Sequence, residues 1–244
     1  MSEQRDLAGL TALVTGATSG IGQATAEQLA RHGADVVVHG RDASHGAAVA
    51  GAITAEGGKA RFAGADLSDP AGPDDLVQQA GAVDVLVNNA GFAWNGPTAQ
   101  IDAAAFDRLF ATNVRAAYFL VGALAPKMAA RRSGSIINVG SDAGQIGLAN
   151  AAAYCATKGA LASMTRSWAA EFSPAGVRVN TVSPGPVYTA ILPAGEIEAR
   201  GAGNLMSRAA QPGEIAEVIA FLASPKASYI TGAVIAVDGG ASAT

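Results

Sequence analysis

Seven short runs of Val, Ile, Leu and Ala alternate with longer helical patterns along almost the whole chain. The runs are nearly continuous rather than alternating with polar residues, so each strand should have helices on both faces. They cover residues 11–15, 34–39, 60–64, 83–87, 135–139, 177–182 and 233–237. The helical patterns lie near residues 20–32, 43–57, 73–80, 102–130, 151–173 and 212–223. This order predicts an α/β fold with right-handed crossovers and a doubly wound parallel sheet.

The composition favours one folded domain that spans residues 1–244. Half of the 244 residues are apolar, and no Pro/Gly/Ser-rich stretch or charge run marks a linker. A net charge of −4 without a basic face argues against nucleic acid or an anionic membrane as a partner. The single cysteine, Cys155, excludes an internal disulfide, and neither an apolar leader nor a run of about 18 apolar residues is present. We therefore expect a soluble protein of the cytoplasm.

A glycine-rich loop, TGATSGIG, joins the first predicted strand to the first predicted helix. Its glycines would let the backbone turn tightly and bring a pyrophosphate to the helix N-terminus, where free N–H groups and the helix dipole hold anions. The GxxxGxG spacing also occurs in ordinary glycine turns, but its place between strand and helix favours a dinucleotide site. The residues expected at the cofactor are Gly16, Thr18, Ser19, Gly20, Ile21 and Gly22.

The end of the second predicted strand, VVVHGRD, favours NADP(H) over NAD(H). Gly40 stands where an NAD site has an acid, and the guanidinium of Arg41 can bind a 2′-phosphate. Asp42 follows directly, and Arg41 could instead be a solvated loop charge, so NAD(H) is the alternative. After the third strand, Asp66, with Leu67 beside it, could accept a hydrogen bond from the adenine amino group or form a turn.

Tyr154 and Lys158 stand four residues apart at the start of the helical pattern YCATKGALASMTRSWAAEF. This spacing places the phenol and the ammonium on the same helix face. A nearby cation favours the phenolate and should lower the pKa of Tyr154 from its ordinary value of about 10. Such a tyrosine can act as a general acid or base near neutral pH, whereas an ordinary surface pair would have no chemical role.

Further polar groups should meet this pair at the carboxyl edge of the sheet. Ser141, at the end of the fifth strand, can hydrogen-bond a substrate oxygen and orient it for proton transfer. Asn113 is a polar residue in an apolar helix and requires a partner, which the neighbouring backbone could supply. The segments VNNAG (87–91) and SPGPV (183–187) follow the fourth and sixth strands.

Together these motifs resemble those of the short-chain dehydrogenase/reductase family, and within it the 3-oxoacyl-[acyl-carrier-protein] reductase-like group. The resemblance runs from about residue 7 to residue 240 and takes in TGATSGIG, ADL, NNAG, Asn113, Ser141, YCATK, SPGPV and YITGAVIAVDGG. It implies a single-domain Rossmann fold, with a seven-stranded parallel sheet in the order 3-2-1-4-5-6-7, and a homotetramer. It also implies hydride transfer between a nicotinamide and a carbonyl or secondary alcohol.

The resemblance also implies a role for each motif residue. Tyr154 would be the general acid/base, and Lys158 would lower its pKa and bind the nicotinamide ribose. Ser141 would hold the substrate carbonyl, and Asn113 would anchor a water that links Lys158 to solvent. The other cofactor residues that it implies are Asn89 and Ala90 on the adenosine-ribose side, Val187 and Thr189 at the carboxamide, and Gly91, Pro184 and Gly185.

These observations favour an NADPH-dependent ketone or 3-oxoacyl reductase whose small carbonyl or alcohol substrate lies near a loop at 188–207. Arg131 and Arg132 could meet an acidic acyl carrier protein, but Ala175 stands where that group has a second basic residue. An NAD-dependent alcohol or sugar dehydrogenase and a non-catalytic dinucleotide-binding sensor are the alternatives. No metal is expected, because the three histidines form no HExxH or Cys/His cluster.

Overall fold

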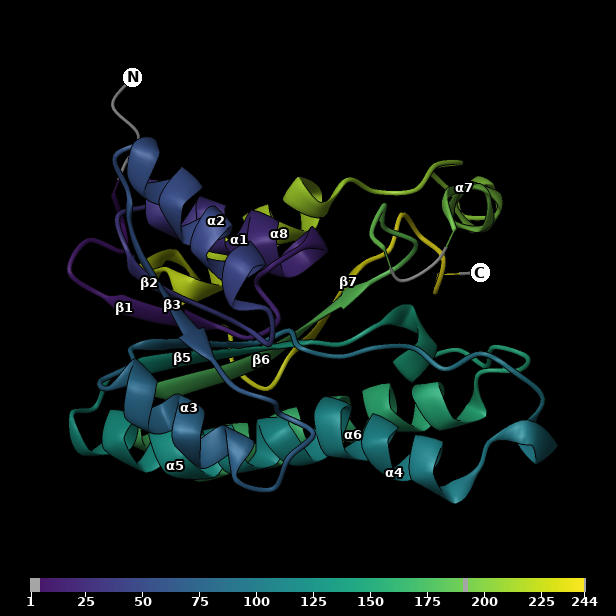
Figure 1. The fold of residues 1–244 in the computed structure, drawn as a ribbon, viewed down its shortest axis with the longest axis horizontal. Coiled ribbons are helices and arrows are strands. Elements are labelled where there is room, and N and C mark those ends of the chain that lie inside the picture. Colours follow the sequence, from purple (N-terminus) through teal and green to yellow (C-terminus); the bar gives the residue numbers. More distant parts are fainter. Residues whose placement is uncertain (1–4, 191–192, 244) are drawn as a thin grey trace.

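A parallel sheet forms the centre of the computed structural model, which describes residues 5–190 and 193–243 (Figure 1). The strands of this described part are β1 (Thr11–Val14), β2 (Asp35–Gly40), β3 (Lys59–Gly64), β4 (Val85–Asn88), β5 (Gly134–Val139), β6 (Val177–Pro184) and β7 (Val234–Val237). They lie in the order β3-β2-β1-β4-β5-β6-β7, and every pairing is parallel. The predicted fold class and strand order are confirmed, and each predicted strand lies within two residues of its expected bounds.

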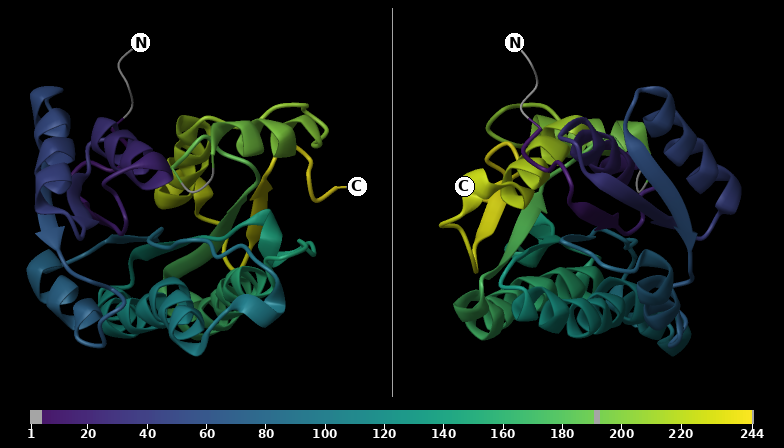
Figure 2. Two further views of the ribbon diagram at one scale, coloured as in Figure 1. Left: turned by 45° about the vertical axis from the view of Figure 1, so that its right-hand side comes forward. Right: turned by 90° about the vertical axis from the view of Figure 1, so that its left-hand side faces the viewer.

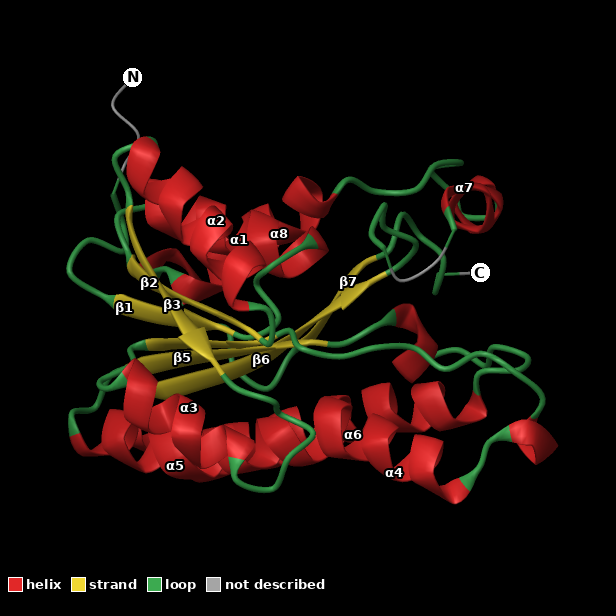
Figure 3. Ribbon diagram, in the orientation of Figure 1, coloured by secondary structure: helices red, strands yellow, loops and turns green. Residues whose placement is uncertain are grey.

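Helices cover both faces of the sheet, as the continuous apolar strands predict (Figures 2 and 3). They are α1 (Gly20–Arg31), α2 (Ala43–Ala55), α3 (Gly72–Ala80), α4 (Ala103–Phe110), α5 (Ala116–Ala130), α6 (Ala152–Phe172), α7 (Ala194–Ala202) and α8 (Pro212–Ala223). Short 3-10 turns form η1 (Thr98–Gln100), η3 (Asp142–Gly144), η4 (Ser173–Ala175) and η5 (Pro225–Ala227), and a π-helical turn forms η2 (Ala111–Arg115). Helices α1, α2 and α8 lie on one face, and α3, α4, α5 and α6 lie on the other (Figure 1).

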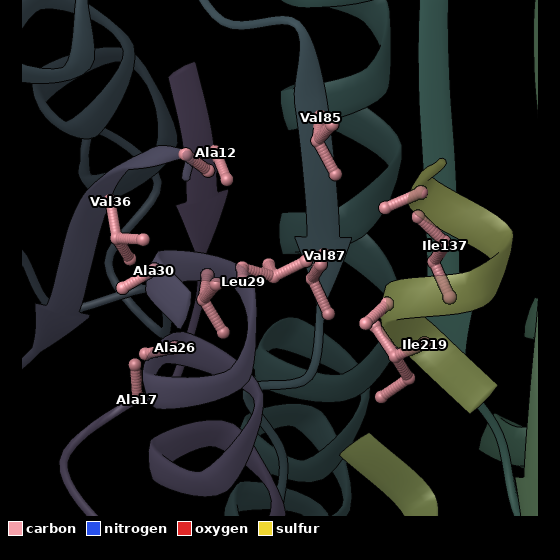
Figure 4. Packing of buried hydrophobic residues seen from close by; sticks show 14 of the residues in the cluster. Ala12, Ala17, Ala26, Leu29, Ala30, Val36, Val85, Val87, Ile137 and Ile219 are labelled. Atoms are coloured by element: carbon pink, nitrogen blue, oxygen red, sulfur yellow. The ribbon is translucent and has the colours of Figure 1, made fainter. Parts of the chain in front are cut away.

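Successive strand residues enter two separate apolar cores, one on each face of the sheet. Val36 and Val87 pack with Leu29 of α1 and Ile219 of α8 on the first face (Figure 4). Their sequence neighbours Val37 and Leu86 belong to the second core, together with the buried residues of α3 and α5. Because neither strand face meets water, a polar residue is disfavoured in a central strand, and polar groups collect where the strands end.

Side chains cap helices α4 and α8 at their N-termini. Asp102 caps α4 by accepting a hydrogen bond from the Ala105 N–H at 2.7 Å. A capping box formed by Gln211 and Glu214 opens α8, with Pro212 as its first residue. These caps satisfy backbone N–H groups that would otherwise lack partners at the helix N-termini.

The long helical segment Ala103–Ala130 contains α4, η2 and α5. Among the described residues it is the one helix that is long and apolar enough, by length and composition, to cross a membrane. Half of its most apolar window is buried inside the protein, where α5 packs against the sheet and α3. The helix is therefore packed as a core helix is, and core helices also meet this criterion of length and apolar composition.

Candidate active site

Two adjoining pockets open at the carboxyl ends of the strands, where ligands bind in open parallel sheets. One, of about 320 Å³, contains Ser141, Tyr154 and Lys158, and we call it the catalytic pocket. The other, of about 630 Å³, runs along the glycine loop, and we call it the loop pocket. Every predicted cofactor residue lines at least one of the two. Both volumes suit small molecules rather than a polymer.

The glycine loop has the conformation and the close approaches that its composition predicts. Gly16 and Gly20 have φ of 62° and 56°, in the left-handed region that favours glycine. A Cβ at Gly22 would lie 2.2 Å from the Gly16 carbonyl oxygen, so the first turn of α1 can pack against the loop only without a side chain. The N-terminus of α1 thus faces the loop pocket with its backbone N–H groups accessible, a cradle that fits a dinucleotide phosphate.

Two polar residues at neighbouring strand ends hold this loop in place. The Asn89 side-chain amide donates to the Thr15 carbonyl at 2.8 Å and to the Gly16 carbonyl at 3.0 Å. The Thr15 hydroxyl accepts from the backbone N–H groups of Asn89 and Ala90. Asn89 therefore holds the backbone of the glycine loop through its side-chain amide, and it also lines both pockets.

His39 is a site residue that sequence reasoning missed. It is 3% exposed at the end of β2, where its Nδ1 accepts from the Gly16 N–H at 3.1 Å. Its Nε2 lies 3.2 Å from the Ala65 carbonyl, which requires the proton on Nε2. Burial lowers the pKa of His39 to about 4, so the ring stays neutral and keeps this tautomer. The continuous apolar run VVVH gave only one signal, a polar residue in a strand that should be buried.

Arg41 lines the loop pocket, whereas the neighbouring Asp42 does not. Asp42 caps α2 by accepting from the backbone N–H groups of Ser44 and His45, and the Ser44 hydroxyl hydrogen bond lowers the pKa of Asp42 to about 2. A Cβ at Gly40 would lie 2.4 Å from Thr18 Cγ2, so an acidic side chain at this position would have to displace the Thr18 side chain. The pocket therefore presents a guanidinium where an NAD site presents an acid.

Asp66 forms the turn that its sequence position allows, at the wall of the loop pocket. Its Oδ1 accepts from the Ser68 N–H at 2.9 Å and from the Ser68 hydroxyl at 2.7 Å, which forms a turn. These hydrogen bonds lower its pKa, and the carboxylate also lines the loop pocket. The turn holds the acid at the pocket wall.

Tyr154 and Lys158 lie on the first turns of α6 and face the catalytic pocket. The Lys158 ammonium is buried, donates to the Val139 carbonyl at 2.8 Å and lies 5.7 Å from the centroid of the Tyr154 ring. Burial lowers the pKa of Lys158 to about 8. The helical spacing thus places both groups on one face, as predicted.

The expected lowering of the Tyr154 pKa is wrong for this structure. Burial raises the pKa of the phenol, and its hydrogen bond with Ser141 opposes that rise without cancelling it. The physical reason is desolvation, which penalises the phenolate. Tyr154 is therefore protonated at neutral pH, in the form that can donate a proton.

Asp142 is a second residue that sequence reasoning missed, directly after Ser141. The Ser141 hydroxyl donates to Asp142 Oδ1 at 2.8 Å, and the Ala143 N–H donates to the same oxygen at 2.7 Å. Burial raises the pKa of Asp142, and its charge in turn raises the pKa of Tyr154. Tyr154, Ser141 and Asp142 thus form one polar cluster in the catalytic pocket.

Asn113 lies behind the pockets rather than in them. Its side chain, 2% exposed, donates to the Phe92 carbonyl at 2.9 Å and accepts from the Phe92 N–H at 3.1 Å. It also donates to the Thr157 hydroxyl of α6 at 3.2 Å. Asn113 therefore joins the loop after β4 to the helix that carries Tyr154, and it acts as a positioning residue.

The loop predicted at 188–207 contains a helix that sequence reasoning missed. Within it α7 contributes Ile197 and Arg200 to the catalytic pocket, while residues 191–192 lie outside the described residues. Two glycines in AGEIEARGA weaken the helical signal, but Glu196 and Arg200 form a 2.8 Å ion pair at helical spacing. In the part of the chain that the structure describes, no group of three His, Cys, Asp or Glu residues could hold a metal ion.

Comparisons with known proteins agree with this geometry. A family model described as "Enoyl-(Acyl carrier protein) reductase" matches residues 16–242. The cis-4-hydroxycyclohexanecarboxylate dehydrogenase of Sinomonas cyclohexanicum is 41% identical over 94% of this chain and 95% of its own length. A solved short-chain dehydrogenase/reductase family protein is 51% identical, with a TM-score of 0.91 over 98% of this chain and all of its own. A 3-oxoacyl (acyl-carrier-protein) reductase of Agrobacterium tumefaciens with NADP bound is 36% identical, with a TM-score of 0.91 over 97% and 96% of the two chains.

A seven-stranded sheet in this order, with a glycine loop and a Tyr–Lys pair at its carboxyl edge, defines a dinucleotide-binding oxidoreductase. The chain belongs to the short-chain dehydrogenase/reductase family. It is an enzyme of that family, an oxidoreductase acting on hydroxyl and carbonyl groups.

Proposed function

We propose that the protein is an NADPH-dependent reductase of small ketones, and in reverse a dehydrogenase of secondary alcohols. The observation that carries the proposal is the meeting of Ser141, Tyr154 and Lys158 in one pocket that adjoins the loop pocket. An apolar pocket with a few convergent polar groups suits a small carbonyl substrate. A sensor that binds a dinucleotide without turnover has no need of this cluster.

In the proposed reaction the nicotinamide, when bound, supplies the hydride that reaches the carbonyl carbon. Ser141 turns its hydroxyl from Asp142 to the substrate oxygen and orients it. Tyr154 donates its phenolic proton to that oxygen as negative charge develops there. The raised pKa of Tyr154 keeps the proton available in this direction, and alcohol oxidation requires the phenolate instead.

Lys158 and Asn113 support these steps. The Lys158 ammonium, held by the Val139 carbonyl, places a positive charge beside the phenol and would bind the nicotinamide ribose. Asn113 fixes the distance between the loop after β4 and α6. We also propose that Asn113 anchors a water molecule that links Lys158 to solvent.

NADP(H) is the proposed cofactor because Arg41 lines the loop pocket at the end of β2, while the neighbouring Asp42 caps α2 and does not line it. The 3-oxoacyl reductase with NADP bound supports this choice. The proposed contacts are Arg41 with the 2′-phosphate, the first turn of α1 with the pyrophosphate, and Asp66 with the adenine.

A free small molecule is the substrate that we propose. Support comes from the dehydrogenase of a hydroxycyclohexanecarboxylate, which is 41% identical. Docking of an acyl carrier protein through Arg131 has less support, because this side chain is bonded to Asp84 at 3.1 Å and to the Val83 carbonyl. Arg131 also follows α5 directly before β5, at the amino end of the sheet and opposite the pocket.

We further propose that residues 1–244 work as one domain, with the substrate loop near 188–207, in a cytoplasmic homotetramer. The free Cys155 is consistent with a reducing compartment. Exposed aromatic side chains on α4 and α5 offer a surface for a second copy: Phe106, Tyr118 and Phe119.

The test is consumption of NADPH with a panel of ketones, using the wild-type protein and Tyr154→Phe. We expect turnover by the wild type and a loss of at least about a thousandfold in the variant, because phenylalanine lacks the hydroxyl that donates the proton. Binding of NADPH, followed by fluorescence, should change less than threefold. Turnover that survives in Tyr154→Phe would overturn the mechanism, and NADPH binding without consumption of any ketone would favour the sensor.

A further inference from the structure

The catalytic pocket contains a cation for which the reaction has no use. Among the described residues that line this pocket, the cations are Lys158, which belongs to the proposed mechanism, and Arg200. Arg200 lies on α7, which crosses over the carboxyl end of the sheet near β7 (Figures 1 and 3). Its side chain is 41% exposed, so it joins the pocket wall to solvent.

The positive charge of Arg200 influences the protonation of groups in the catalytic pocket. It lowers the pKa values of both Asp142 and Tyr154, against the larger rise that burial causes in each. Much of the pocket wall is carbon, with Phe92, Ile146 and Leu148 among the lining residues. A charge at the rim of such a pocket acts over a longer range than it would in bulk water.

The present partner of Arg200 is easily exchanged. One terminal nitrogen of the guanidinium donates to Glu196, one helical turn earlier, at 2.8 Å. Exposed pairs at this spacing contribute only about 0.3–0.5 kcal/mol. A guanidinium has a planar fork that binds a carboxylate by two parallel hydrogen bonds, which is stronger than the single contact with Glu196.

We propose that Arg200 binds an anionic group of the substrate, so that the enzyme prefers oxo acids and the corresponding hydroxy acids over uncharged ketones and alcohols. The carboxylate would sit at the α7 rim while the carbonyl lies between Ser141 and Tyr154. Asp142 already accepts hydrogen bonds from Ser141 and Ala143, and its negative charge would keep the acid away from its own part of the pocket. This inference rests on the proposed function.

The test compares substrates that differ in charge and little else. The probes are 4-oxopentanoate, 5-oxohexanoate and 6-oxoheptanoate, each beside its methyl ester, with NADPH consumption as the readout. At the best chain length we expect the acid to have a kcat/KM at least tenfold above that of its ester. Arg200→Gln should remove that margin through KM for the acid, with less than threefold change for the ester and in NADPH binding.

Arg31→Gln is the matched control. Arg31 is similarly exposed and pairs with Glu27 at the same helical spacing on α1, away from the catalytic pocket. It should leave the preference for the acid unchanged. Arg200→Glu should reverse the preference, because it places a second negative charge at the rim.

Different failures have different meanings. If the wild type reduces acids and esters equally, Arg200 does not bind the substrate carboxylate and the inference is wrong. If Arg200→Gln slows both equally, Arg200 acts on Asp142 and Tyr154 rather than on the substrate, and the inference is again wrong. A change confined to the Kd of NADPH would instead assign Arg200 to the cofactor and also overturn it. If neither acids nor esters consume NADPH, the proposed function itself fails.

Discussion

His39 shows how one buried side chain determines the shape of a phosphate-binding loop. Its ring connects the Gly16 N–H to the Ala65 carbonyl, and only the neutral form with a proton on Nε2 makes both contacts. The glycines permit the loop conformation, but they do not select it. The imidazole and the Asn89 amide provide that selection by bonding to the Gly16 N–H and carbonyl respectively.

We predict that His39 makes the protein less stable as the pH falls below about 6.5. The pKa of His39 is about 4 in the folded protein and 6.5 ordinarily, so the unfolded chain binds this proton first. Folding stability is therefore present in full above pH 6.5 and is lost as the pH falls towards 4, by roughly 2–3 kcal/mol at about pH 4.5. Urea unfolding should show this loss in the wild type.

His39→Asn keeps a polar side chain without a titrating group, and its stability should fall less over the same pH range. His45→Asn, an exposed histidine on α2, is the control and should follow the wild type. Parallel curves for the wild type and His39→Asn would contradict the assigned protonation state.

At the same scale, Arg41→Ala should reduce the preference for NADPH over NADH. A guanidinium paired with a 2′-phosphate contributes enough that its loss should cost at least about tenfold in NADPH affinity, or about 1.4 kcal/mol. NADH affinity should stay within threefold. Fluorescence titrations with both dinucleotides measure this, and equal binding of NADH and NADPH by the wild type would place Arg41 outside the cofactor site.

At the scale of elements, the π-helical turn η2 and helix α7 place residues at the site, although helix propensity alone predicts neither of them. The π-helical turn η2 interrupts the segment Ala103–Ala130 and contains Asn113, whose side chain then bonds both to Phe92 and to α6. Such turns occur often at functional sites. Helix α7 forms despite its glycines, since Ile197 is buried against the catalytic pocket and Gly201 packs on the backbone of Ala209.

A buried polar chain attaches α6 to the sheet. The Asn88 amide donates to Asn138, Asn138 donates to the Thr165 hydroxyl, and Thr165 shares a hydrogen bond with Thr181, over distances of 2.7–2.9 Å. The chain crosses β4, β5, α6 and β6 and therefore helps to hold α6 at a fixed distance from the strands. Sequence reasoning did not find it, because each member alone resembles an isolated polar residue in an apolar segment.

Asn138→Ala should destabilise the protein by about 2–4 kcal/mol, because it leaves two buried donors or acceptors without their partner. The change is measured as the free energy of urea unfolding. Gln100→Ala, at an exposed position on η1, should change it by less than about 0.5 kcal/mol. A loss of less than about 0.5 kcal/mol for Asn138→Ala as well would show that this buried chain of hydrogen bonds contributes no net stability to the fold.

At the scale of the whole molecule, one surface carries more aromatic side chains than a monomer requires. Tyr118 and Phe119 are 53% and 52% exposed on α5, and they contact each other edge to face at a centroid distance of 5.6 Å. Phe106 and Phe110 stack beside them on α4, with centroids 4.6 Å apart. These four residues form an aromatic patch on the face of the molecule that lies away from the sheet.

Phe119→Glu should weaken the proposed homotetramer at this patch. A carboxylate there must be desolvated on association, so we expect dimers or monomers at micromolar concentration in light scattering after gel filtration. Ala52→Glu adds the same charge on an exposed position of α2 and should leave the assembly unchanged. A wild-type monomer, or a tetrameric Phe119→Glu, would contradict an interface at the aromatic patch.

Local patterns were sufficient to predict a parallel sheet with helices on both faces and the glycine loop, whereas the strand order and several pocket residues came from the family resemblance, and α7 was missed. Apolar runs between helical patterns indicate a parallel sheet with helices on both faces, because a strand such as β4 then meets apolar side chains on each side. Glycines at 16, 20 and 22 indicate the cofactor loop for a reason that is equally local, the absence of Cβ atoms.

Tertiary structure alone decided the electrostatics and the contents of the catalytic pocket. The Tyr154 pKa rises rather than falls because burial around the phenol outweighs the favourable groups near it, and burial is a property of the packed molecule. His39, Asp142 and Arg200 enter the site from β2, η3 and α7, elements far apart in the chain whose approach no local pattern records. The sequence by itself therefore determined where the chemistry takes place, and the folded chain decided the charge that each group carries there.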